Sequence, residues 1–178
     1  TATANAVAVA EHVISMFLSL SKSISKYDEE VRKGNFKLNA DKIQTFELFN
    51  KNILIAGFGR IGKKLISRCL AFDTNVYVYD PYVDEKIIKK FGGIKVDKIE
   101  DGLKKADYVS LHMPLTNETK NLINYSVLKT MKKNSIIINT ARGGIINELE
   151  LEKALNEGLI FGAALDVFSK EPVEKDNP

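Results

Sequence analysis

Three glycines in one short segment are the first residues in this sequence whose spacing suggests chemistry. The apolar run Ile53–Ala56 leads directly into Gly57-Phe58-Gly59-Arg60-Ile61-Gly62, and an amphipathic stretch follows. Glycine permits a tight turn at the first position, close approach of a phosphate at the second, and close packing of a helix on a strand at the third. The N–H groups at the start of a helix attract phosphate oxygens. The segment therefore predicts a phosphate-binding turn between a strand and a helix.

An acidic residue, Asp80, follows the next apolar run, Val76–Tyr79, eighteen residues after Gly62. A carboxylate at this place accepts hydrogen bonds from the hydroxyls of an adenosine ribose. It would repel a 2′-phosphate, and the next two residues, Pro81 and Tyr82, carry no compensating positive charge. The turn and Asp80 together predict NAD, rather than NADP, as the cofactor. A P-loop is excluded, because that motif needs Ser or Thr at position 64, which is lysine here.

The elements that must position these residues begin at Lys51, where short apolar runs start to alternate with amphipathic stretches. Continuous apolar runs are typical of strands buried on both faces of a parallel sheet. Regular strand–helix alternation predicts an α/β fold with a doubly wound, Rossmann-like parallel sheet. The expected strands are Ile53–Ala56, Val76–Tyr79, Tyr108–Leu111, Ile136–Asn139 and Gly162–Leu165, with a weaker one near Ile94; the expected helices are Ile61–Phe72, Glu85–Phe91, Ile99–Lys105, Ser126–Met131 and Glu148–Asn156.

The first fifty residues follow another pattern. Apolar residues recur at helical spacing over Asn5–Lys26 and predict one long helix, whose apolar stripe we expect to pack against another domain or subunit. Residues 27–50 are polar and are expected to connect this helix to the nucleotide-binding core, with little regular structure. We assign residues 51–168 to that core and residues 169–178 to the start of a return towards a second domain.

Composition excludes several classes of function. The net charge of +3 over 178 residues is too small and too dispersed to predict nucleic-acid binding. Cys69 is the single cysteine, so neither an intrachain disulfide nor a cysteine-cluster metal site is expected. It lies in an apolar stretch, and we expect it to be a small core residue rather than a nucleophile. The sequence shows no apolar run of bilayer-spanning length and no signal peptide, so we expect no membrane association and a cytoplasmic location.

Six segments line up in order with one known family. They are Ala4-Asn5-Ala6-Val7-Ala8-Val9-Ala10-Glu11-His12, Gly57–Gly62, Tyr79-Asp80-Pro81-Tyr82, His112-Met113-Pro114-Leu115-Thr116, Asn139-Thr140-Ala141-Arg142-Gly143-Gly144, and Gly162–Phe168 followed by Glu171-Pro172. Over nearly the whole chain this set resembles the D-isomer-specific 2-hydroxyacid dehydrogenase family. The likeness is greatest to its phosphoglycerate dehydrogenase branch.

The resemblance implies an NAD-dependent oxidoreductase acting on the CH–OH group of a small 2-hydroxy acid. Arg142 would bind the carboxylate and carbonyl of the substrate, because its planar guanidinium matches such groups. Glu171 would hydrogen-bond a catalytic histidine and favour its protonated form. The implied cofactor-binding residues are Gly57, Gly59, Arg60, Ile61 and Gly62 at the pyrophosphate, Asp80, Met113 and Pro114 at the adenosine, and Thr140, Ala141, Arg142 and Asp166 at the nicotinamide end.

One part of the family pattern is not met. The catalytic histidine should follow Glu171-Pro172, and neither histidine present, His12 or His112, matches it; we expect His12 to be an interface or capping residue. The family's substrate domain is also expected to be missing, so we expect this chain to bind NAD without turnover. The family's pairing of subunits implies a homodimer. The alternative is an NADH-sensing binding module of the corepressor type, which shares the fold and many of the motifs.

Overall fold

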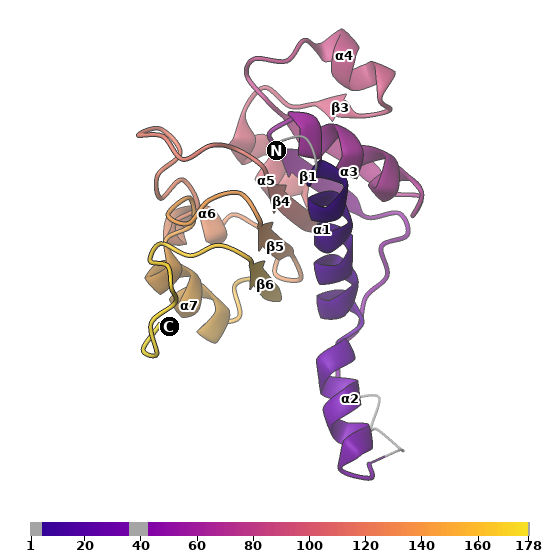
Figure 1. Cartoon of the computed structure of the whole chain (residues 1–178). Coiled ribbons are helices and arrows are strands. Elements are labelled where there is room, and N and C mark those ends of the chain that lie inside the picture. Colours follow the sequence, from indigo (N-terminus) through magenta and orange to yellow (C-terminus); the bar gives the residue numbers. More distant parts are fainter. Residues whose placement is uncertain (1–4, 36–42, 178) are drawn as a thin grey trace.

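The computed structural model describes residues 5–35 and 43–177. Six strands form one sheet in the order β3-β2-β1-β4-β5-β6 (Figure 1), and every pairing between them is parallel. This is the strand order of doubly wound folds that bind dinucleotides, so the expected fold is confirmed. The strands are β1 (Asn52–Ala56), β2 (Asn75–Tyr79), β3 (Ile94–Lys95), β4 (Tyr108–Leu111), β5 (Ile136–Asn139) and β6 (Gly162–Leu165).

Helices cover both faces of the sheet, and β1 shows why. Its residues alternate between two apolar cores: Ile53 and Ile55 join the one beneath α1 and α3, while Leu54 and Ala56 join the one beneath α5, α6 and α7. A strand that is apolar on both faces can be buried only in such a three-layer arrangement. The helices of the core are α3 (Arg60–Leu70), α4 (Glu85–Lys90), α5 (Ile99–Lys105), α6 (Tyr125–Leu128) and α7 (Glu148–Asn156).

The N-terminal segment differs from its sequence prediction. The single helix expected over Asn5–Lys26 is wrong: the chain forms α1 (Ala6–Ser21) and α2 (Ile24–Arg32), whose axes differ by 57°. The break lies at Ser23, which has a left-handed backbone (φ 49°) and whose hydroxyl donates to the carbonyl oxygen of Gln44 at 2.9 Å. The helix therefore stops at this point, and Ser23 instead binds the later segment that contains Gln44. The connecting segment expected from residue 27 therefore begins with helix, and residues 36–42 lie outside the described part.

The apolar stripe of α1, expected to pack against another domain or subunit, packs on the core of this chain. Ala10, Val13 and Phe17 are fully buried on the core beneath α1 and α3. In contrast, α2 extends away from the sheet (Figure 1), with Ile24 and Val31 exposed. Among the described residues no single helix is long and apolar enough to cross a membrane; the bent pair α1 and α2 meets that test only by length and composition.

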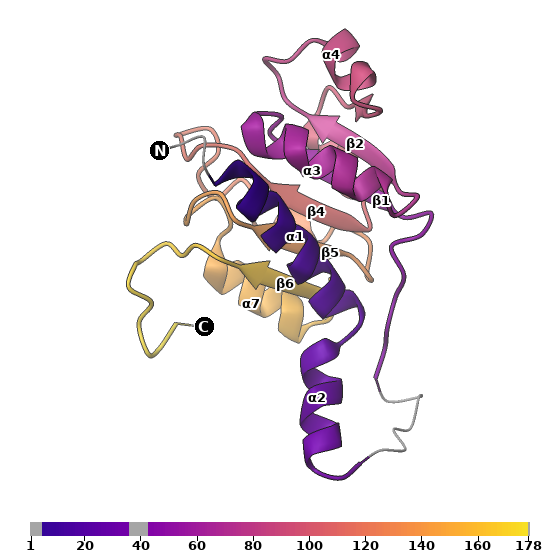
Figure 2. The same ribbon diagram turned by 45° about the vertical axis from the view of Figure 1, so that its right-hand side comes forward.

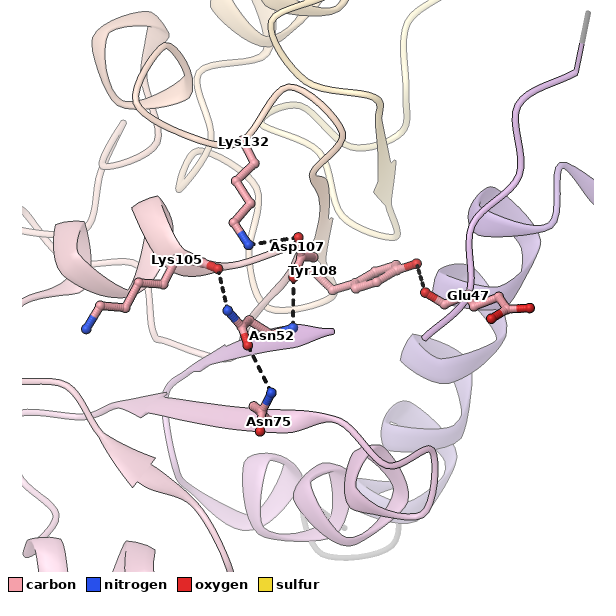
Figure 3. A network of polar contacts seen from close by, with 7 residues as sticks. All are labelled: Glu47, Asn52, Asn75, Lys105, Asp107, Tyr108 and Lys132. Carbon is pink, nitrogen blue, oxygen red and sulfur yellow. Dashed lines mark hydrogen bonds and ion pairs between the residues drawn. The ribbon is translucent and has the colours of Figure 1, made fainter. Parts of the chain in front are cut away.

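A polar network closes the amino-terminal edge of the sheet (Figure 3). The carboxylate of Asp107, just before β4, accepts the backbone N–H of Asn52 at 2.9 Å and the ammonium of Lys132 at 2.9 Å. The side chain of Asn52 donates to the carbonyl oxygen of Lys105 at 3.0 Å and accepts from Asn75 at 3.2 Å. The network satisfies groups that the short strands leave without ladder partners. It lies at the edge opposite the glycine turn.

Candidate functional site

The glycine turn after β1 is packed too closely for side chains at two of its three positions. Gly57 has φ +103°, and a Cβ there would lie 2.6 Å from the carbonyl oxygen of His112. A Cβ on Gly62 would lie 2.5 Å from the carbonyl oxygen of Gly57. Gly59 is different, because a Cβ there would meet nothing within 4 Å among the described residues. The turn therefore has a tight first glycine, open space at the second and a helix–strand contact at the third, as a bound pyrophosphate requires.

Helix α3 starts directly at this turn. The N–H of Lys63 donates to the carbonyl oxygen of Gly59 at 3.1 Å and closes the first helical turn. The N–H groups of Arg60, Ile61 and Gly62 precede it, and groups in a first helical turn have no intrahelical acceptor. The first turn contains no acidic residue and contributes the exposed Arg60. These amides, the helix dipole and the arginine fit a group with two negative phosphates.

The carboxylate of Asp80 lies beside the turn. Its Oδ2 accepts the N–H of Phe58 at 2.8 Å, and its Oδ1 accepts the N–H of Tyr82 at 2.9 Å. These two bonds fix the carboxylate between the end of β2 and the glycine turn. Each carboxylate oxygen can accept a second hydrogen bond, so Asp80 can still receive the hydroxyls of a ribose. Asp80 therefore lies where a ribose-binding carboxylate is expected, and two hydrogen bonds hold its carboxylate in place.

A pocket of about 310 Å³ opens between these groups and the end of β4. It brings together five of the residues that the sequence predicts for the cofactor: Gly57, Gly59, Asp80, Met113 and Pro114. Met113 is buried and apolar, as suits the side of a base. Arg60, Ile61 and Gly62 belong to the adjoining turn rather than to the lining of this pocket.

The sequence prediction missed the outer wall of the pocket. This wall includes Ile99, Thr116, Glu118, Thr119 and Leu122. The hydroxyl of Thr119 donates to the carbonyl oxygen of Pro114 at 2.7 Å and accepts the N–H of Thr116 at 2.8 Å, which folds the loop back over the pocket. Two threonines three residues apart after a proline are a signal for such a turn.

His112 forms part of the pocket floor without carrying charge. Its backbone N–H donates to the carbonyl oxygen of Ala56 at 2.7 Å, and its Nε2 lies 2.8 Å from the hydroxyl of Ser110. Burial lowers the pKa of His112 to about 4, so the ring is neutral near pH 7. Its Nδ1 is buried and has no hydrogen-bond partner among the described residues. His112 therefore supports the pocket by packing and not by attracting phosphate.

The remaining predicted residues lie at the carboxyl ends of β5 and β6. The side chain of Asn139 organises the loop after β5: its Oδ1 accepts the N–H of Ala141 at 3.0 Å, and its Nδ2 donates to the carbonyl oxygen of Arg142 at 2.9 Å. The N–H of Asp166 donates to the carbonyl oxygen of Asn139 at 3.0 Å. Thr140, Ala141, Arg142 and Asp166 are thus brought together, outside the pocket at Asp80.

No hydrogen bond or ion pair joins Arg142 to Glu171 in the described part of the chain. Arg142 is exposed, and its guanidinium donates back to the carbonyl oxygen of Ala141 at 2.6 Å. Glu171 is exposed in the C-terminal segment, and its Oε1 accepts the N–H of Phe168 at 3.0 Å. Both side chains are therefore free to turn towards another group.

His12 lies inside α1 and does not cap it, and its expected role as an interface residue stays a prediction. Its Nε2 lies 3.7 Å from Oδ1 of Asp166, so α1 contributes a titratable group to the end of β6. Helical spacing could not reveal this contact, because it joins two residues far apart in the sequence. Cys69 is a core residue as expected, and burial raises the pKa of its thiol to about 12.

Comparisons with known proteins agree with this geometry. A family model described as "D-isomer specific 2-hydroxyacid dehydrogenase, NAD binding domain" matches residues 14–178. The chain is 39% identical over 175 residues to the D-3-phosphoglycerate dehydrogenase of Methanocaldococcus jannaschii, covering 98% of this chain and 33% of that protein. The chain thus spans about a third of the length of this curated relative.

Two solved structures have the same fold. A formate dehydrogenase from Granulicella superposes with a TM-score of 0.92 at 27% identity, over 98% of this chain and 46% of that one. A D-lactate dehydrogenase from Aquifex aeolicus, solved with NAD and lactic acid, superposes with a TM-score of 0.85 at 35% identity, over 92% of this chain and 48% of that one. In both, the matched part is about half of the solved chain.

Proposed function

Because this chain belongs to the D-isomer specific 2-hydroxyacid dehydrogenase family, as its NAD-binding domain, we propose that it forms the cofactor half of an NAD-dependent oxidoreductase. The substrate class would be a small 2-hydroxy acid, oxidised at its CH–OH group or formed from the 2-keto acid. The observation that carries the proposal is the placement of the Asp80 carboxylate against the open glycine turn.

The chain's own groups are arranged to bind the cofactor along the carboxyl edge of the sheet. Gly57, Gly59 and Gly62 with the amides of α3 would hold the pyrophosphate, while Asp80, Met113 and Pro114 would hold the adenosine. Thr140, Ala141, Arg142 and Asp166 would line the other end. The bound nicotinamide supplies hydride chemistry; the residues of this chain supply position and charge.

We assign the substrate's carboxylate and carbonyl to Arg142. A guanidinium forms two parallel hydrogen bonds with such a group, whereas a lysine ammonium acts as a point charge. Arg142 follows β5 at the edge where open α/β sheets bind ligands, and its exposure leaves it able to turn away from the carbonyl of Ala141. Glu171 would orient the acid–base histidine by accepting its N–H, since a carboxylate beside imidazole favours the protonated ring.

A phosphoglycerate-type acid is the substrate that the relatives favour. The M. jannaschii protein carries that name, and its identity of 39% extends over 98% of this chain. The side chains that would contact the far end of the acid are not among those assigned above. The substrate is therefore proposed from the likeness to relatives, whereas the cofactor rests on the site itself.

The test is a steady-state assay of the full-length protein with NADH and a panel of 2-keto acids. We expect turnover with at least one acid. Arg142→Ala should lower kcat/KM by about 100-fold, and Arg142→Lys should recover little of it, because a charged, bidentate contact is lost. NADH binding without turnover of any acid, or an unchanged Arg142→Ala variant, would contradict the enzyme and favour the corepressor type of module.

We also propose a homodimer built on the N-terminal helices. Ile24 and Val31 are exposed by 52% and 53% on α2, which makes few contacts with the rest of the chain beyond α1. Burial of such apolar side chains in an isologous interface would stabilise a pair of subunits. Light scattering should give twice the chain mass, and Ile24→Glu combined with Val31→Glu should give the monomer; a wild-type monomer would contradict the proposal.

A further inference from the structure

The topology of the sheet determines which of its halves receives each end of a dinucleotide. Strands β1 to β3 form one half, which carries Asp80 and the pocket beside it. Strands β4 to β6 form the other half, and Asp166 follows its last strand. With the pyrophosphate on the turn after β1 and the adenosine ribose at Asp80, the second nucleotide would lie over the ends of β5 and β6.

Helix α1 bridges these two halves (Figure 2). It packs on α3, which belongs to the first half, and on β5 and β6, which belong to the second. Two successive α1 residues make the polar contacts. The carboxylate of Glu11 accepts a hydrogen bond from Arg68 of α3 at 2.9 Å, and the imidazole of His12 lies 3.7 Å from the carboxylate of Asp166.

The backbones on both sides of the contact between His12 and Asp166 are held firmly. On α1, Ala10 and Val13 flank His12 and are fully buried, so the helix cannot rotate without loss of core packing. Directly after β6, the N–H of Asp166 continues the strand ladder by donating to the carbonyl oxygen of Asn139 at 3.0 Å. The two side chains remain 46% and 53% exposed, which leaves room for a ligand to reach the carboxylate.

We propose that His12 is a positioning residue that orients the Asp166 carboxylate towards the nicotinamide end of the bound dinucleotide. The proposal rests on the proposed function, because it requires NAD to lie across the carboxyl edge of the sheet. A carboxylate there can accept an amide N–H, such as those of the nicotinamide carboxamide. The imidazole of His12 lies on the side of Asp166 that faces α1, and in its protonated form it attracts the carboxylate to that side.

The experiment compares two ligands by isothermal titration calorimetry on chain 1–178. NAD contains the nicotinamide and its ribose, whereas ADP-ribose lacks the nicotinamide and keeps every group assigned to the first half. The variants are His12→Gln, Asp166→Asn and the double variant. Glu11→Gln is the matched control, because it removes the neighbouring α1 contact on the side away from β6.

In buffer in which His12 is protonated, we expect His12→Gln to weaken NAD binding roughly two- to fivefold, the range of a solvent-exposed ion pair, and to leave ADP-ribose binding unchanged. The double variant should bind NAD no more weakly than Asp166→Asn alone, and Glu11→Gln should bind both ligands as the wild type does. If His12→Gln weakens the binding of NAD and of ADP-ribose equally, the role of His12 is purely structural and the proposal is overturned. An unchanged NAD affinity of this variant would also overturn it. If wild-type protein binds neither ligand, the proposed function itself fails.

Discussion

A Cβ atom on Gly62 would lie 2.5 Å from the carbonyl oxygen of Gly57, so the start of α3 rests directly on the backbone of the turn that ends β1. At Gly59, the neighbouring glycine of the same motif, an added Cβ would meet no described atom within 4 Å, and φ is −74°. One motif therefore contains a glycine needed by the fold and a glycine needed by the ligand. The two requirements can be separated by experiment.

Alanine should lower the free energy of unfolding at Gly62 but not at Gly59. Gly62→Ala should lower the free energy of unfolding by about 1–3 kcal/mol, because α3 must shift, and it should also weaken NAD binding. Gly59→Ala should keep the wild-type stability and still weaken NAD binding, because the added methyl group occupies the space of the phosphates. Urea denaturation and calorimetry on both variants check this. Loss of stability in Gly59→Ala would contradict the assignment.

Asp80→Asn should reduce affinity for NAD roughly tenfold or more, since hydrogen bonds from ribose hydroxyls to a charged acceptor are lost. The asparagine carbonyl can still accept the N–H of Phe58 but not that of the exposed Tyr82 as well, so the free energy of unfolding should fall by about 1 kcal/mol. The same variant should bind NADP more tightly than the wild type does, because a negative charge is removed from the region of the 2′-phosphate. Calorimetry with both dinucleotides is the measurement. Wild-type protein that binds both equally would refute the role of Asp80.

The buried His112 should make stability depend on pH. Its pKa falls from 6.5 to about 4 on folding, so the unfolded chain takes up a proton first as the pH decreases. The contribution of His112 is fully present above pH 6.5 and is lost as the pH falls through 4, a change of up to about 3 kcal/mol.

Carboxylates also titrate in this range, so the test compares wild type with His112→Gln. We expect the stability advantage of the wild type to be constant above pH 6.5 and to shrink towards pH 4 in urea denaturation. A difference independent of pH would show that His112 is not buried in its neutral form.

Asp107→Ala should destabilise the fold without affecting the cofactor. The substitution leaves the N–H of Asn52 without its acceptor and should cost about 1–3 kcal/mol of the free energy of unfolding. Lys132→Met should cost less than 1 kcal/mol, because its partly exposed ion pair is solvated. NAD affinity should stay at the wild-type value in both variants, since the network lies at the amino-terminal edge (Figure 3). A loss of NAD binding matching the loss of stability would contradict this separation of the two edges.

The sequence predicted the core of the fold well because its signals there are local. The bounds expected for β4, β5 and β6 agree with the structure, and those for β1 and β2 differ only at Asn52 and Asn75, polar residues at strand starts. The glycine turn and Asp80 were predictable for the same reason: each lies directly after an apolar strand. The break at Ser23 could not be predicted, because it depends on a hydrogen bond to Gln44, twenty-one residues away.

Site residues could be predicted only where a sequence motif directly follows the end of a strand. Met113 and Pro114 were expected in the pocket and lie there, whereas the loop that ends at Thr119 was missed, since its fold depends on a threonine hydroxyl bonded to the backbone. The contact of His12 with Asp166 was missed because residues 154 positions apart meet only through packing of α1 on the sheet. The predicted roles of Arg142 and Glu171 stay predictions.

The most direct test of the account is calorimetric titration of chain 1–178 with NAD up to millimolar concentration, in parallel with its Gly59→Ala variant. We predict saturable heat for the wild type and strongly reduced heat for the variant, with the two proteins equally stable in urea. Absence of heat from a folded wild-type chain, or equal binding by both proteins, would contradict the assignment of the turn after β1 as the pyrophosphate site.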